Sequence, residues 1–84
     1  MQAGTQYLTF FVAGEEVGVE IDGVREIVAF ETATRIPSAP AWIRGVMNLR
    51  GAVLPVLDLA VKFGFGPTAI GTRTCVVLIQ LQLA

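Results

Sequence analysis

The sequence predicts an all-β domain, either a barrel or a sandwich. Its strand-like runs are short and recur at a spacing of about 8–12 residues, with glycine-containing turns between them. No stretch shows the apolar periodicity of an amphipathic helix of useful length. With 84 residues, the chain is long enough for one small domain.

The first third of the chain predicts a β-hairpin followed by a third strand. Tyr7–Val12 is rich in aromatic and β-branched residues, which favour strands. Residues 13–16 contain a turn, and Val17–Ile21 then alternates apolar and outward-facing residues. Asp22-Gly23 is a second turn signal, and we expect a short strand or extended segment over Val24–Phe30.

A proline-containing loop and a second pair of strands are expected next. Pro37 and Pro40 predict a loop over 31–41, with at most one short helical turn near 39–43. Two apolar runs, Val46–Leu49 and Ala52–Leu57, read as strands that flank Arg50-Gly51. Glycine adopts positive φ without steric cost, so this dipeptide predicts a tight turn that displays one arginine.

The last part of the sequence predicts a loop and one final strand. Residues 61–67 contain three turn formers, and 74–83 forms a strongly apolar strand in which Cys75 is expected to be buried. Such a strand is an exposed edge unless another segment pairs with it. We therefore expect this chain to self-associate, by strand exchange or by pairing of this edge.

The composition is apolar for so small a domain. Hydrophobic residues make up 54% and charged residues 15%, whereas about 25% charged is usual. Part of the apolar surface is therefore expected to be covered by something else. The net charge of −1, with scattered cations, argues against nucleic acid binding. The sequence lacks a signal peptide and an 18-residue apolar run, so we expect a cytoplasmic protein without membrane insertion.

The residues that carry most enzyme chemistry are missing or isolated. The chain has no histidine, and Ser38, its only serine, has no neighbouring base to activate it. Asp22 and Asp58 lie far apart and read as turn residues that accept backbone hydrogen bonds. No metal-ligand spacing or phosphate-binding loop is visible. We expect no enzymatic activity, no metal and no cofactor.

The residues point to recognition of another protein. Arg50 is either a cation that contacts a partner or a residue that braces the fold, for example by an ion pair with Glu26. Glu26 can equally be a plain exposed strand residue. Val24 and Ile27 are core residues, or contact residues if they flank an open groove.

Six segments, in order, resemble the CheW-like domain. The most specific combination is Asn48–Gly51 followed by Leu54–Leu59. The resemblance implies two small SH3-like β-barrel subdomains and a scaffold role that links chemotaxis receptors to the histidine kinase CheA. It also places Val24, Glu26, Gly45 and Arg50 in partner-binding surfaces. The matching segments are Tyr7–Phe10, Glu16–Ile21, Val24–Ile27, Thr34–Pro37, Pro40–Gly51 and Leu54–Leu59.

The resemblance also implies that 1–84 is the N-terminal part of such a domain, because family members have a second half with further strands. The expected partners are the regulatory domain of the kinase and the cytoplasmic tip of the receptors, next to the membrane receptor arrays. Two other readings remain open. One is a CheW-like regulatory module of a larger signalling protein, such as a kinase or a receiver-domain fusion. The other is a small-ligand-binding β-barrel, which needs a pocket with convergent polar groups.

Overall fold

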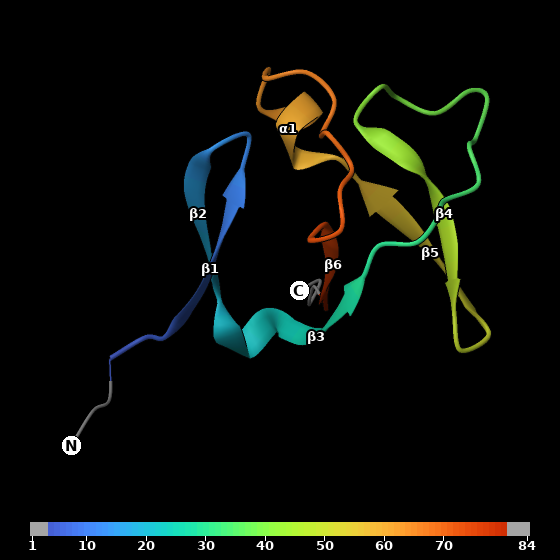
Figure 1. Ribbon diagram of the computed structural model, residues 1–84. Coiled ribbons are helices and arrows are strands. Elements are labelled where there is room, and N and C mark those ends of the chain that lie inside the picture. Colours follow the sequence, from blue (N-terminus) through green and yellow to red (C-terminus); the bar gives the residue numbers. More distant parts are fainter. Residues whose placement is uncertain (1–3, 81–84) are drawn as a thin grey trace.

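A computed structural model describes residues 4–80 and confirms the all-β class (Figure 1). One α-helix of a single turn and one turn of 3-10 helix, η1, accompany the strands. In chain order the elements are β1 (Tyr7–Val12), β2 (Glu15–Glu20), η1 (Ile21–Gly23), β3 (Val24–Ala29), β4 (Ile43–Leu49), β5 (Ala52–Leu57), α1 (Leu59–Lys62) and β6 (Cys75–Ile79).

The strands form three separate antiparallel pairs, β1–β2, β3–β6 and β4–β5. Two pairs are local hairpins, whereas β3–β6 joins segments that are far apart in the chain. Figure 1 shows the β1–β2 hairpin on one side, the β4–β5 hairpin on the other, and β3–β6 between them. A closed barrel gives each strand two hydrogen-bonded neighbours. Within residues 4–80 each strand has one, so the expected SH3-like strands are present but are not closed into a barrel.

Both hairpins are closed by two-residue turns with positive φ at each position. The φ angles are 50° and 82° at Ala13-Gly14, and 50° and 89° at Arg50-Gly51. This is the type I′ geometry, whose twist matches that of the flanking strands. In the second turn, the side chain of Asn48 accepts a hydrogen bond of 3.0 Å from the Gly51 N–H. The predicted arginine-displaying turn is thus confirmed.

The segment near 39–43, where at most one short helical turn was expected, contains no helix. That segment contains hydrogen-bonded turns, one of them closed by Ile43 N–H donating to the Pro40 carbonyl at 3.0 Å, and β4 begins at Ile43. The α-helix lies further along, at Leu59–Lys62, and overlaps the expected loop. It begins there because the Asp58 side chain accepts a hydrogen bond from the Ala60 N–H and caps the helix.

The core of the described residues is small. Among residues 4–80, only Val12, Val56 and Ala60 are buried hydrophobic residues, while eleven large hydrophobic side chains are exposed. The final strand, expected over 74–83, is β6, and residues 81–83 lie outside the described part. Cys75 is exposed rather than buried.

Candidate partner-binding surface

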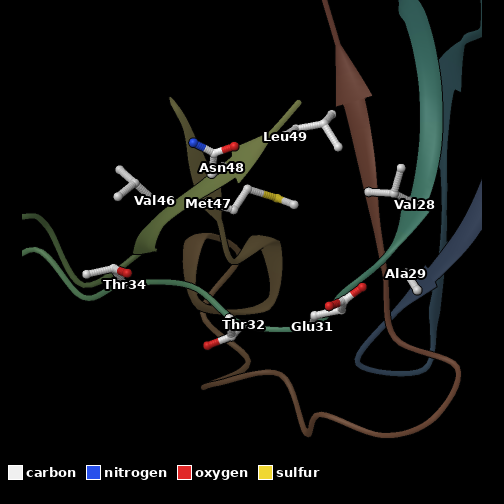
Figure 2. A pocket seen from close by; sticks show the side chains of 9 residues that line it. All are labelled: Val28, Ala29, Glu31, Thr32, Thr34, Val46, Met47, Asn48 and Leu49. Carbon is white, nitrogen blue, oxygen red and sulfur yellow. The ribbon is translucent and has the colours of Figure 1, made fainter. Parts of the chain in front are cut away.

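The space between β3 and β4 is a groove of about 480 Å³, which we call the β3–β4 groove. Figure 2 shows Val28 of β3 and Met47 and Leu49 of β4 pointing into this space. Met47 and Leu49 share one face of β4 because successive strand residues point to opposite faces. The lining residues are Val28, Ala29, Glu31, Thr32, Thr34, Val46, Met47, Asn48 and Leu49.

An ion pair connects the two sides of this groove. Arg50, in the β4–β5 turn, donates from Nη2 to the carboxylate of Glu26 on β3. The Arg50 side chain is 67% exposed and that of Glu26 is 32% exposed. Ion pairs with this much solvent contact stabilise a fold by about 1 kcal/mol or less. The pair therefore orients two charged groups beside the groove more than it holds the fold together.

Gly45 is buried in β4, where the chain makes a close approach. Its φ is +153°, and a Cβ built there would lie 2.3 Å from the carbonyl oxygen of Thr34. Beside it, Thr34 and Val46 exchange two backbone hydrogen bonds of 2.8 Å, which attach the loop before β4 to the strand. The register of β4 on β5 also shifts between Ile43 and Gly45. The structure thus provides a packing reason for a glycine at this position.

The other predicted contact residues lie on β3. Val24 is half-buried at the start of the strand and pairs with Ile79, while Ile27 is 49% exposed and pairs with Val77. Glu26 and Ile27 are consecutive strand residues, so their side chains point to opposite faces. Of the predicted site residues, the structure brings Glu26 and Arg50 together and places Ile27 on the other face of the β3–β6 sheet.

Several hydrogen-bond donors surround one buried carboxylate, Asp58, at the end of the β4–β5 hairpin opposite the Arg50 turn. We call this group the Asp58 cluster. Asp58 is only 5% exposed. Its Oδ1 accepts from the Thr68 hydroxyl at 2.6 Å and the Ala60 N–H at 3.1 Å. Its Oδ2 accepts from Arg44 Nη1 and the Thr68 N–H, each at 3.0 Å. Asp58 therefore ties the segment after α1 to β4.

The pKa of Asp58 reflects two opposing effects. Burial raises the pKa, but hydrogen bonds from the Thr68 hydroxyl and from the backbone of Thr68, Val61 and Ala60 outweigh it. The net result is a pKa below the ordinary value. The sequence indicated Asp58 as a turn residue, and the helix cap confirms that reading. No local pattern pointed to Thr68 or Arg44 as its partners.

The most buried carboxylate of the described residues, Asp58, is already occupied by hydrogen bonds. A second cavity, of about 460 Å³, contains the Asp58 carboxylate, but both its oxygens are already engaged. Within residues 4–80, no buried side-chain nitrogen or oxygen lacks a hydrogen-bond partner, and no three potential ligand side chains cluster around a metal position. The same residues include no helix with the length and hydrophobicity to span a bilayer.

A groove that combines apolar side chains on one side with polar ones, beside an exposed ion pair, is compatible with a docking surface for another protein. Comparison with known proteins is consistent with this class of site, a protein-binding surface. The family model of the CheW-like domain matches residues 6–83, and the chain belongs to this family.

Individual relatives support the same family. The chain is 38% identical over 81 residues to the probable chemotaxis protein CheW of Rhizobium etli, covering 96% of this chain and 52% of that protein. It is also 38% identical to the chemotaxis protein CheW of Klebsiella aerogenes, covering 92% of this chain and 46% of that protein.

A solved structure has the same fold. The crystal structure of the scaffolding protein TtCheW from Thermoanaerobacter tengcongensis superposes with a TM-score of 0.85 at 31% identity, covering 95% of this chain and 52% of that one. The chain therefore spans about half the length of the relatives that it matches.

Proposed function

We propose that this chain is a non-enzymatic adaptor in bacterial chemotaxis, and that it takes part in coupling chemoreceptors to the histidine kinase CheA. The observation that carries the proposal is the β3–β4 groove with the Arg50–Glu26 pair beside it. Membership of the CheW-like family, with relatives named chemotaxis protein CheW, supports the same role.

The groove and the ion pair have different parts in this role. Val28, Met47 and Leu49 supply an apolar floor against which the apolar face of a partner segment can be buried. Arg50 and Glu26 set the register of the partner, because exposed charges contribute more to specificity and association rate than to affinity. The guanidinium has five donors, so the bond to Glu26 leaves others for a partner carboxylate.

The remaining predicted site residues have more limited roles in the proposal. Gly45 acts through the shape of β4, since it is buried against the Thr34 backbone. Ile27 belongs to a second contact area on the β3–β6 sheet, because it faces away from the groove, and Val24 contributes at the start of the same strand.

The partners that we propose are the regulatory domain of CheA and the cytoplasmic tip of the receptors. The place of action is accordingly the cytoplasm beside the receptor arrays, with no membrane insertion and no nucleic acid partner. Self-association of the chain is a separate proposal, because it rests on the open edge of β6 and not on the comparisons.

Calorimetric titration of the chain with the kinase regulatory domain tests this role. We expect saturable binding that Met47→Asp weakens tenfold or more, because the substitution puts a charge on the groove floor. Phe11→Ser is the matched control, since Phe11 is 72% exposed on β1 and does not line the groove. Circular dichroism of each variant monitors the fold. No binding by the folded chain, or equal loss in both variants, contradicts the proposal.

Arg50→Glu probes the ion pair in the same titration. It places two like charges beside the groove, so we expect weaker binding with a slower association rate. Arg50→Ala and Glu26→Ala separate a direct contact from a bracing role. If these residues contact the partner directly, each substitution weakens binding with little change in melting temperature. A large loss of stability in either variant contradicts the direct contact.

A further inference from the structure

The two hairpin turns of this chain have the same backbone geometry but carry different residues at their tips. The φ angles are 50° and 82° at Ala13-Gly14, and 50° and 89° at Arg50-Gly51. In both hairpins the two residues that flank the turn lie opposite each other in the strand register. The β1–β2 turn therefore serves as an internal reference for what the β4–β5 turn needs in order to form.

One side-chain hydrogen bond distinguishes the two turns. Asn48 Oδ1 accepts from the Gly51 N–H at 3.0 Å. The equivalent residue of the first hairpin, two positions before Ala13, is Phe11, whose side chain has no acceptor. Since the β1–β2 turn adopts nearly the same φ angles without such a bond, the Asn48 bond is not required to close a turn of this type.

The bond holds the peptide group that joins Arg50 to Gly51. This group is planar, so fixing its N–H sets the direction of the backbone on one side of Arg50. The φ of Arg50 is 50°, a conformation in which these turns favour glycine, asparagine or aspartate. Residues held in such sparsely populated regions need support from their surroundings, and they concentrate at functional sites. The Asn48 bond provides this support at the turn that carries the arginine.

The side chain of Arg50 makes a long-range contact that Ala13 has no side chain to make. Its Nη2 donates to the carboxylate of Glu26 on β3, although the Arg50 side chain is 67% exposed. A long side chain that keeps one partner while mostly in solvent loses rotamer freedom. A small rotation of the backbone at its root also moves the guanidinium away from that partner. The extra bond is therefore present at the turn whose side chain has to reach a distant strand.

We propose that Asn48 is a positioning residue for Arg50. Its bond to Gly51 keeps the guanidinium beside Glu26 before a partner binds and leaves the remaining donors available to that partner. Asn48 is itself exposed and belongs to the lining of the β3–β4 groove, as Figure 2 shows. Preorganisation of this kind favours binding, because less side-chain freedom is lost in the complex. This inference rests on the proposed function, in which Arg50 sets the register of the partner.

The free chain tests the positioning without any partner. In nuclear magnetic resonance of the isotope-labelled chain, Asn48→Ala is expected to increase the mobility of the Arg50 Nε–H. It is also expected to speed hydrogen exchange of the Gly51 N–H by roughly 2- to 10-fold, the range that one net hydrogen bond provides, with no change at Gly14. Asn48→Asp keeps an acceptor oxygen and is expected to retain the slow exchange. An Arg50 side chain that is as ordered in Asn48→Ala as in the wild type overturns the proposal.

Val53→Ala is the matched control for this measurement. Val53 lies opposite Asn48 on β5 and is 66% exposed. The substitution removes a side chain from the same position along the hairpin and leaves the bond between Asn48 and Gly51 intact. If Val53→Ala frees Arg50 as much as Asn48→Ala does, the effect belongs to the hairpin in general and the proposal is overturned.

Titration with the kinase regulatory domain tests the consequence for binding. Asn48→Ala is expected to weaken binding about threefold or more in the wild-type chain, but less than about 1.5-fold in the Arg50→Ala variant, because nothing is then left to position. An equal loss in both backgrounds indicates a direct contact of Asn48 or a loosened hairpin, and it overturns the proposal. Absence of binding by the wild-type chain contradicts the proposed function, whereas the mobility of Arg50 in the free chain still decides the positioning role.

Discussion

Substitution of Gly45 by alanine tests the close approach between β4 and the preceding loop. An added Cβ would lie 2.3 Å from the Thr34 carbonyl oxygen and 2.8 Å from its carbonyl carbon. Both neighbours are backbone atoms, so neither can move away by a change of rotamer. The loop itself must shift, and the two 2.8 Å hydrogen bonds between Thr34 and Val46 must lengthen or break.

The expected cost of Gly45→Ala has two parts. Holding a non-glycine residue in an unfavourable backbone region costs about 1–3 kcal/mol, and each lost backbone hydrogen bond costs about 1 kcal/mol. The sum is about 3–5 kcal/mol. A natural domain of this length has a free energy of unfolding of only about 4–13 kcal/mol. Gly45→Ala is therefore expected to remove a large fraction of the stability.

Urea unfolding followed by circular dichroism measures this cost, with Gly51→Ala as the matched control. Gly51 also has a positive φ, +89°, but a Cβ there meets nothing within 4 Å. It is expected to cost only about 1–2 kcal/mol of backbone strain. If both alanine variants unfold at the same urea concentration, the contact with Thr34 does not matter and the reasoning is refuted.

Three further predictions follow from the charged and exposed residues. Because the folded state lowers the pKa of Asp58, its ionised form stabilises the fold above about pH 4, and this contribution is lost as the pH falls further. Asp58→Asn should therefore lower the free energy of unfolding at pH 7 and weaken its fall between pH 5 and 3, and an unchanged pH profile contradicts this. A double-mutant cycle of Arg50→Ala and Glu26→Ala should give a salt-sensitive coupling of about 1 kcal/mol or less in unfolding experiments, whereas a coupling above about 2 kcal/mol would show that the pair holds the fold together. Phe11→Ser, at a side chain 72% exposed, should change the free energy of unfolding by less than about 0.5 kcal/mol, and a larger loss would mean that β1 packs more tightly than the structure shows.

The sequence was informative wherever structure depends on neighbouring residues. The β1–β2 and β4–β5 hairpins follow from apolar runs separated by two-residue turns, and the structure confirms both. The ion pair between Arg50 and Glu26, one of the readings considered for these residues, is confirmed as a contact. Its part in partner binding stays a prediction.

The sequence was less informative where a short local signal competed with tertiary context. The prolines near residue 40 indicated a loop with at most one helical turn, and pairing with β5 extends the chain from Ile43 onward. Asp58 was expected to accept backbone hydrogen bonds as a turn residue, but the helix that it caps was not predicted, because the four residues of α1 are too few to show helical periodicity. Cys75 was expected to be buried because its strand is apolar, although burial of a strand side chain depends on what covers that face of the sheet.

The sequence by itself determined the strand class, the two hairpins, the turn that displays Arg50 and the family, since all of these depend on residues close together in the chain. Only the tertiary structure revealed the β3–β4 groove, the Asp58 cluster and the reason for glycine at position 45. Each of these arises where segments distant in the chain meet, and the side-chain pattern of one segment does not specify which other segment will lie against it.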